Sequence, residues 1–314
     1  MIMQTMKEIF EEIETNGGMT PSRRLRDIAN RFPEQIAFRD KRYGIWNEMS
    51  YKEFWMEVQY VGCALNYFGI QKTEKVAIHS ENRPEWLIAD IGVQAIGGIT
   101  VGLYPTNPPA EVQYLLSHSE SKILFAEDQE QVDKALEVLD EVPNLSKIIY
   151  FEEKGLFRYD SEKLMRWDEF LKIGKEEYEK NKDFVNFCID EIKSEDVALM
   201  IYTSGTTGPP KASMLSHGNM EWTASIIPDL SFTPNISNPE YLSYLPLCHV
   251  FGRLVDEIIA INSIGTINFA ESIDTVQRDL AEIQPSIFPA VPRILERMHA
   301  CLLYTSDAAD DSAC

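Results

Sequence analysis

Hydroxyl side chains, glycines and one lysine are concentrated in the segment Ile201-Tyr-Thr-Ser-Gly-Thr-Thr-Gly-Pro-Pro-Lys-Ala-Ser213. An apolar run from Val197 to Tyr202 leads directly into it, which is the pattern of a buried strand that ends in a loop. Gly205 and Gly208 allow positive φ and close approach to a ligand, and Lys211 adds a mobile positive charge. Because backbone N–H groups in such a turn can surround an anion, the segment predicts a phosphate-binding loop. Its hydroxyl donors are Thr203, Ser204, Thr206 and Thr207.

The spacing within this loop excludes the common phosphate-binding motifs. A Walker A loop has four residues between its glycines and then Gly-Lys-Ser/Thr. Here Gly208 follows Gly205 by three positions and Lys211 follows Pro210. The dinucleotide and kinase loops are excluded as well, because the segment has no G-x-G. A Ser/Thr/Gly surface linker is the alternative on composition alone. The strand before the loop and the lysine after it argue against a linker.

Tyr202 to Lys211 resembles, nearly letter for letter, the phosphate-binding loop of the adenylate-forming superfamily. That superfamily comprises acyl-CoA synthetases, luciferases and peptide-synthetase adenylation domains. The segment departs from the commonest pattern at Ala212, where the family has glycine, and this small change should leave the loop competent. The resemblance implies magnesium beside Thr206. It also implies that ATP is bound by Thr203, Ser204, Gly205, Thr206, Thr207, Gly208 and Lys211.

A second informative segment is Tyr244-Leu-Pro-Leu-Cys-His-Val-Phe-Gly-Arg253. His249 follows an expected strand end, where open α/β sheets place ligand-facing groups, although a histidine there is more often structural. The segment resembles the adenylate-former stretch whose histidine lies beside the acyl carboxylate. The resemblance therefore implies a catalytic role for His249, which would orient the carboxylate for attack on the α-phosphorus. The turn Phe288 to Glu296 resembles one that borders the pocket, although Pro292 is explained by helix initiation alone.

The resemblance extends from about Thr20 to His299 and is closest to bacterial-type long-chain fatty-acid CoA ligases. The segments Ser80–Trp86 and Tyr104–Val112 also match that type, and we assign them no chemistry. The resemblance implies ATP, Mg²⁺ and CoA as cofactor and substrates, with a fatty acid as the acid activated. Two alternatives remain open. One is an aryl-acid or amino-acid adenylating enzyme, and the other is a nucleotide- or acyl-binding module without catalysis.

Apolar strands alternate with amphipathic helices along the chain, which predicts parallel sheets covered on both faces. We expect an α/β fold of two stacked, mostly parallel sheets flanked by helices, the large N-terminal domain of an adenylate-forming enzyme. Residues 1–195 would form a first subdomain with a charged linker, and 196–300 a second, incomplete one that carries the loop. Expected strands are 36–40, 46–49, 76–79, 99–104, 122–126, 147–151, 197–202, 241–245, 266–269 and 286–291. Expected helices are 6–13, one ending at 30, 50–68, 83–95, 109–116, 129–140, one around 167–170, 219–227, 254–261, 275–283 and 293–300.

Composition limits the class of protein further. The chain has 314 residues, 44% of them hydrophobic, and a formal net charge of −21. A strongly acidic surface argues against nucleic acid as a partner. Five cysteines without a C-x-x-C motif indicate reduced thiols, and hence a cytoplasmic protein. No apolar run approaches the ~18 residues of a membrane span. Fatty acids partition into bilayers, so peripheral membrane contact is compatible with such a substrate, but no feature of the sequence indicates it.

Residues 301–314 neither continue nor cap the preceding pattern. Their sequence resembles the translation of a sequencing-library adapter, so we expect a non-native tail on a truncated reading frame. A frayed acidic tail is the alternative. The family's ribose-binding aspartate, metal-binding glutamate and adenylating lysine would then lie beyond the break. We therefore expect residues 1–314 alone to be inactive, and ATP–pyrophosphate exchange by this chain would contradict that expectation.

Overall fold

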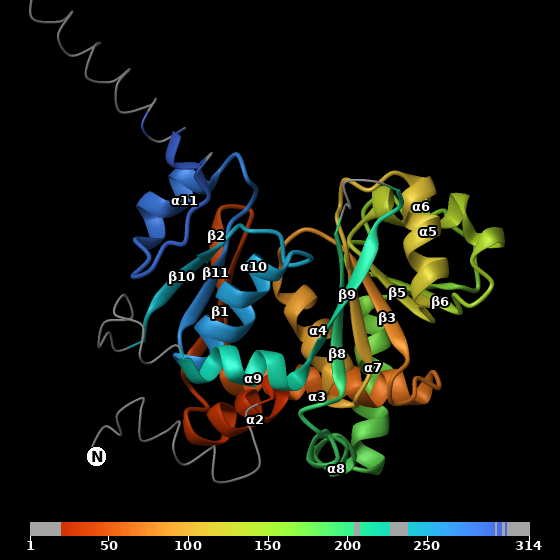
Figure 1. Ribbon diagram of the computed structural model, residues 1–314, viewed down its shortest axis with the longest axis horizontal. Coiled ribbons are helices and arrows are strands. Elements are labelled where there is room, and N and C mark those ends of the chain that lie inside the picture. Colours follow the sequence, from red (N-terminus) through yellow and green to blue (C-terminus); the bar gives the residue numbers. More distant parts are fainter. Residues whose placement is uncertain (1–19, 204–207, 227–237, 293, 297–298, 300–314) are drawn as a thin grey trace, which may run out of the picture.

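The computed structural model describes residues 20–203, 208–226, 238–292, 294–296 and 299. The strands in these residues form two sheets with helices on and between them (Figure 1). Each sheet is mainly parallel and has one antiparallel pair at an edge. This arrangement confirms the expected α/β fold. None of the described helices combines the length and apolar content that a bilayer span requires.

The larger sheet has seven strands in the order β7-β6-β5-β3-β4-β8-β9. Its central strands β3, β4 and β5 are buried almost throughout, which explains why they read as continuous apolar runs. The expectation missed β9, an exposed edge strand whose mixed sequence lacks such a run. It also missed β7, which has three residues. The strands of this sheet are β3 (Lys75–His79), β4 (Ile99–Leu103), β5 (Ile123–Ala126), β6 (Lys147–Tyr150), β7 (Leu164–Arg166), β8 (Val197–Thr203) and β9 (Lys211–Ser216).

The smaller sheet has the order β10-β11-β1-β2 and joins distant parts of the chain. Phe38 in β1 pairs with Ile267 in β11, and the two strands are parallel. β8 and β9, in turn, lie in the larger sheet with β3 to β7. The two sheets therefore do not follow the expected division of the chain at residue 195. The strands of this sheet are β1 (Ile36–Arg42), β2 (Ile45–Ser50), β10 (Glu240–Ser243) and β11 (Thr266–Phe269).

The expected strand at residues 286–291 is wrong. Only Ile287 pairs there, through a single bridge to Tyr241. The remaining backbone contact is to Glu240, whose O accepts from Ser286 N–H and from Ile287 N–H, and whose N–H donates to the Ser286 hydroxyl. The backbone turns away after this point, toward Pro292, where helical residues begin. The run 286–291 is short and apolar, but it contains Pro289 and is flanked by Pro285 and Pro292, and an apolar run of this length does not by itself distinguish a strand from other buried segments.

Most expected helices are present, and one cap shows why they begin where they do. The hydroxyl of Ser50 accepts from Glu53 N–H, and the Glu53 carboxylate accepts from Ser50 N–H at 2.8 Å.

The expected helix at 6–13 lies outside the described residues. α8 was missed because it is short and lies in a charged interval. The helices are α2 (Pro21–Arg31), α3 (Tyr51–Tyr67), α4 (Pro84–Ala95), α5 (Pro109–Ser119), α6 (Gln129–Glu137), the 3₁₀ turn η1 (Leu139–Glu141), α7 (Trp167–Lys180), α8 (Phe184–Asp190), α9 (His217–Ile226), α10 (Val250–Arg253), the π-helical η3 (Leu254–Ala260) and α11 (Val276–Ile283).

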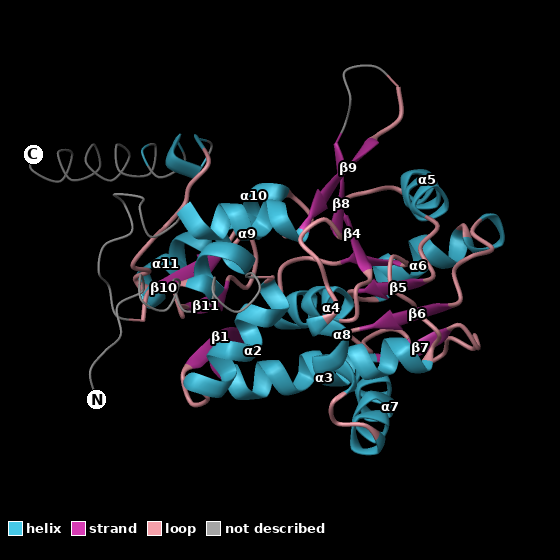
Figure 2. Ribbon diagram, turned by 60° about the horizontal axis from the view of Figure 1, so that its bottom comes forward, coloured by secondary structure: helices cyan, strands magenta, loops and turns pink. Residues whose placement is uncertain are grey.

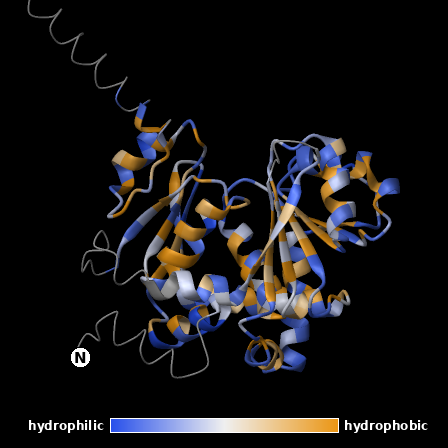
Figure 3. Cartoon of the chain, in the orientation of Figure 1, coloured by the Kyte–Doolittle hydropathy of each residue, from blue (hydrophilic) through white to orange (hydrophobic). Residues whose placement is uncertain are grey.

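α4 lies between the two sheets and contacts β3 and β4 of one and β1 of the other (Figure 1). Every residue of α4 is at least half-buried, and Trp86 is fully buried. Apolar residues are concentrated on the strands and on the helices that face them (Figure 3). α3 extends from the smaller sheet to α7 and covers one end of both sheets (Figure 2). The sheets are therefore held together by a shared, buried layer of helix.

Candidate functional site

The two flanks of the predicted phosphate loop are the ends of a β-hairpin. Thr203 is the last residue of β8, Lys211 is the first of β9, and the two are paired in the antiparallel register. Gly208 has φ +92°, and a Cβ there would meet no atom within 4 Å, so this glycine serves the backbone conformation and not close packing. Ser204, Gly205, Thr206 and Thr207 lie outside the described residues, and their roles stay predictions.

α5 contacts both flanks of this hairpin loop. The Tyr114 hydroxyl donates to Pro210 O at 3.0 Å, after the loop. His118 Nδ1 and the Tyr202 hydroxyl are hydrogen-bonded at 2.7 Å, before the loop. Burial raises the pKa of Tyr202 to about 12, so its hydroxyl stays protonated near neutral pH. One helix thus fixes the entry to the loop and the exit from it.

A cavity of 330 Å³ lies beside the hairpin loop. Its walls come from the carboxyl ends of β4 and β8 and from α5, the edge where open α/β sheets bind ligands. Several of its walls are polar, including the hydroxyl of Thr106 and the amide of Asn107. We call it the loop cavity. It is lined by Gly102, Tyr104, Thr106, Asn107, Glu111, Leu115, Tyr202, Thr203, Pro210 and His249.

A second cavity, of 560 Å³, adjoins the loop cavity and is mainly apolar. We call it the apolar cavity. Tyr104 and His249 line both cavities, so the two spaces meet at these side chains. The turn at residues 288–296 borders the apolar cavity, through Val291 and Ile294, as the sequence resemblance implied. The full lining is Tyr104, Tyr244, Leu245, Pro246, His249, Phe251, Gly252, Ile273, Asp274, Val291 and Ile294.

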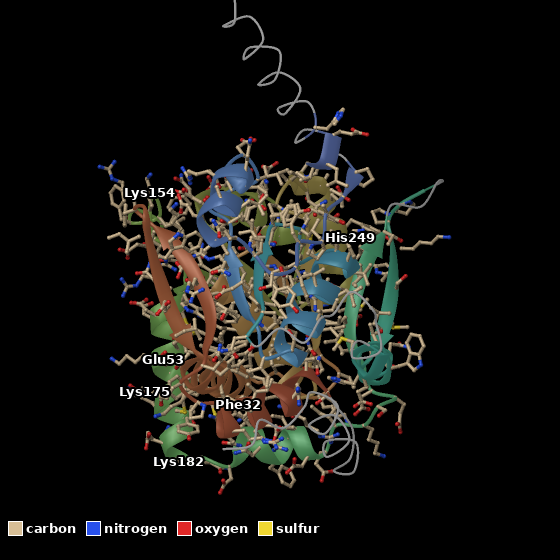
Figure 4. All side chains as sticks on the ribbon, turned by 90° about the vertical axis from the view of Figure 1, so that its left-hand side faces the viewer. Phe32, Glu53, Lys154, Lys175, Lys182 and His249 are labelled. Carbon is tan, nitrogen blue, oxygen red and sulfur yellow. The ribbon has the colours of Figure 1, made fainter. Side chains whose placement is uncertain are left out.

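His249 is exposed and caps the short helix α10. Its Nδ1 accepts from Phe251 N–H at 3.1 Å, so the neutral ring carries its proton on Nε2. Nε2–H is thereby available as a donor where the two cavities meet. Figure 4 shows His249 in the upper half of the molecule, away from Phe32 and Glu53 in the lower half. The catalytic role expected of His249 stays a prediction, and its position between the cavities is a finding.

Two buried contacts fix the wall that the cavities share. A methyl group on Gly102 of β4 would lie 2.8 Å from Cys248 Cα, so glycine lets the His249 segment approach the larger sheet. His79 Nε2 is hydrogen-bonded to Tyr104 O at 3.0 Å and holds the end of β4. Burial lowers the pKa of His79 to about 4, so the ring is neutral and acts as a donor to that carbonyl.

Within the described residues, no three His, Cys, Asp or Glu side chains come together as metal ligands. The expected magnesium contact, Thr206, lies outside those residues. Magnesium in nucleotide sites takes much of its coordination from phosphate oxygens and water, and needs few protein ligands. The loop cavity offers hydroxyl and amide groups. These groups suit a magnesium ion that is held mainly by phosphate oxygens and water.

Sequence reasoning missed the side chains that support the site. Tyr114 and His118 were not singled out, and Asn82 lies in a segment to which no chemistry was assigned. For Asn82 the available signal was the matching segment Ser80–Trp86, which like Tyr104–Val112 lies at the end of a predicted strand, whereas Tyr114 and His118 lie beyond Val112 in α5 and had no such signal. Polar residues at carboxyl strand ends gather at one edge of a parallel sheet, and that rule pointed to both segments.

The fold places a partly polar cavity beside the hairpin loop and an apolar cavity next to it. Residues 25–312 match the family described as AMP-binding enzyme. The chain belongs to this family, which is the superfamily that the loop resembles.

Curated relatives of this chain are long-chain-fatty-acid–CoA ligases. The chain is 31% identical over 280 residues to ACSBG2 of Xenopus laevis, an alignment covering 87% of this chain and 37% of that relative. It is 30% identical over 287 residues to ACSBG2 of Homo sapiens, covering 90% of this chain and 42% of the relative. The chain thus spans less than half the length of these relatives.

Solved structures agree on the fold. The coronafacic acid ligase of Pectobacterium brasiliense superposes with a TM-score of 0.73 at 18% identity, covering 89% of this chain and 51% of that one. At this identity the likeness concerns the architecture alone. It confirms that the two sheets and their connecting helices form the N-terminal part of an adenylate-forming fold.

Proposed function

We propose that the whole protein activates a long-chain fatty acid with ATP and then transfers the acyl group to CoA. In the first step a carboxylate oxygen attacks the α-phosphorus, and pyrophosphate leaves. In the second step the CoA sulfur attacks the acyl carbonyl carbon, the thiol proton goes to solvent, and AMP leaves. The acyl-adenylate is the intermediate between the two steps. It reacts with the thiol because AMP is a far better leaving group than the oxide ion that a free carboxylate would have to expel.

The observation that carries this proposal is the wall shared by the two cavities. The reaction requires an alkyl chain in an apolar space, a polyphosphate in a polar one, and the carboxylate where they meet. The apolar cavity, the loop cavity and the pair Tyr104 and His249 supply these three places. A volume of 560 Å³ is within the range of small-molecule sites, about 300 to 1,000 Å³.

The described residues have distinct roles in this proposal. Nε2–H of His249 donates to the acyl carboxylate and orients it toward the nucleotide. Thr203 and Lys211, at the flanks of the hairpin, direct a hydroxyl and an ammonium group to the phosphates. Magnesium, when bound with ATP, would neutralise phosphate charge. Residues Ser204 to Thr207 complete the loop in the proposal.

The test begins with binding, measured by calorimetry on residues 1–314 with MgATP and with palmitate separately. Ile273→Glu places a carboxylate at the rim of the apolar cavity, where Ile273 is 54% exposed, and should weaken palmitate binding at least about tenfold, because a bound alkyl chain would cover that charge. MgATP binding should stay within about twofold. The matched control is Ile45→Glu, at an exposed isoleucine of β2 that lines neither cavity.

Three outcomes would each contradict one part of the proposed function. Preferential binding of benzoate or of an amino acid would favour an aryl- or amino-acid substrate. Equal loss of palmitate affinity in both glutamate variants would show that the fatty acid does not bind in the apolar cavity. For the complete gene product, the assay is ATP–pyrophosphate exchange driven by palmitate. Binding without exchange there would indicate a module that lacks catalysis.

A further inference from the structure

Asn82, in the connection between β3 and α4, makes three hydrogen bonds to the segment that leads to His249. Its Nδ2 donates to Leu245 O at 2.7 Å and to Ser243 Oγ at 2.9 Å. Its Oδ1 accepts from Leu247 N–H at 3.0 Å. Asn82 belongs to the larger sheet's connections, whereas Ser243 ends β10 of the smaller sheet. A single amide therefore links the two sheets at the wall of the apolar cavity.

The segment needs these bonds because it has no regular partner strand. Buried backbone groups must be satisfied, and Leu245 and Leu247 are both buried. Asn82 bonds to residues on both sides of Pro246, whose carbonyl accepts from His249 N–H at 2.9 Å. The turn from Pro246 to His249 is thus closed by its own hydrogen bond and held from outside by the Asn82 amide.

Arg253 holds the same turn from its other side. Its Nε donates to Leu247 O at 3.1 Å, and its Nη1 contacts Asp90 Oδ2 at 2.7 Å. The guanidinium also lies over the Trp86 ring, 4.6 Å from the centroid. Asp90 and Trp86 are both on α4, which begins two residues after Asn82. The connection before α4 and the helix itself therefore enclose the turn.

We propose that Asn82 is a positioning residue: it fixes the Pro246–His249 turn, and with it the His249 ring, against the sheet that carries the hairpin loop. The inference rests on the proposed function for its effect on the acid substrate. We expect nucleotide binding to depend little on Asn82: its three bonds go to the wall of the apolar cavity and none to the hairpin loop, and His249 is the one member of the Pro246–His249 turn that also lines the loop cavity.

The test compares Asn82→Ala with wild type in residues 1–314. Hydrogen exchange of the Leu247 and His249 amides should accelerate at least about tenfold, while exchange in β8 stays unchanged. Palmitate affinity should fall about tenfold, and MgATP affinity should change less than about twofold. Asn82→Asp keeps an acceptor for Leu247 N–H but no donor, so it should fold and give an intermediate effect on both measurements.

Asn262→Ala is the matched control, because the buried Asn262 amide also donates to a backbone carbonyl, Ile258 O, at 2.6 Å, and is remote from the turn. It should leave exchange at Leu247 and the affinity for palmitate as in wild type. Wild-type exchange at Leu247 and His249 in Asn82→Ala would overturn the proposal, and so would equal losses of palmitate and MgATP affinity. Failure of wild type to bind palmitate would count against the proposed function, while the exchange rates would still decide the role of Asn82.

Discussion

Tyr114 and Tyr202 show how individual hydroxyl groups hold the two flanks of the hairpin loop. Tyr114 bonds to the backbone after the loop, and Tyr202 precedes it and bonds to His118. Both tyrosine rings are at least partly buried, and each hydroxyl has a defined partner. In the proposed function the loop binds the phosphates of ATP, and support of its flanks from outside would lower the entropy lost when that ligand binds.

Tyr114→Phe removes one hydroxyl and keeps the ring, so it isolates the bond to Pro210. A typical hydrogen bond contributes about 1 kcal/mol net. We expect MgATP affinity to fall about threefold to fivefold and palmitate affinity to stay unchanged, both measured by calorimetry. Tyr159→Phe is the control, since that hydroxyl bonds to Asp133 on an exposed surface. An unchanged affinity for MgATP in Tyr114→Phe would mean that α5 does not support the loop.

At the scale of elements, the contact between α3 and α7 depends on a glycine. A methyl group on Gly174 would lie 2.0 Å from Tyr60 O, well inside contact distance. In an open helix, Gly→Ala stabilises by about 1 kcal/mol. Here the clash reverses the sign, and Gly174→Ala should lower the free energy of unfolding by about 1–3 kcal/mol in urea titration.

Lys175→Ala serves as the control for that prediction, because Lys175 follows Gly174 in α7 and is exposed. It should change stability by less than about 0.5 kcal/mol. An alanine at position 174 that matches or exceeds wild-type stability would show that α3 and α7 separate without cost.

Elements that are buried on both faces could be predicted from the sequence, and edge elements could not. β3, β4 and β8 were predicted because a doubly covered strand must be apolar throughout. β9 was missed because a half-exposed edge strand has no comparable pattern. The flanks of the loop were predicted from residue type alone. Asn82 was not, because its three partners lie more than a hundred positions away along the chain.

For the whole molecule, buried carboxyl groups between the sheets set the pH dependence of stability. Burial raises the pKa of Asp256 to about 7, and burial together with nearby Asp90 raises that of Glu257. Ser243 faces Asp256, while Gln94 and Arg253 face Glu257. Groups with a raised folded-state pKa stabilise at low pH, and that contribution is lost as pH rises through the folded value.

We therefore expect the free energy of unfolding to fall by about 1 kcal/mol between pH 7 and 8.5, as measured by urea titration. Burial lowers the pKa of His79 and of His217 to about 4, so these rings favour the folded state as pH rises toward 6.5 and change little above 7. Asp256→Asn and Glu257→Gln should each flatten the decline. Stability that is constant or rising across this window in wild type would contradict the expectation.

The pairing of β1 with β11 has a consequence for synthesis of the chain. The Thr266 hydroxyl donates to Ile36 O, 230 positions earlier, so the N-terminal hairpin leaves the ribosome long before its partner strand. At about 5–20 residues per second, the delay is on the order of ten seconds or more. Throughout it, one edge of β1 and the apolar side chain of Phe38 lack their native cover. Nascent chains of this fold therefore expose an unpaired strand edge and an apolar surface while about 230 further residues are synthesised.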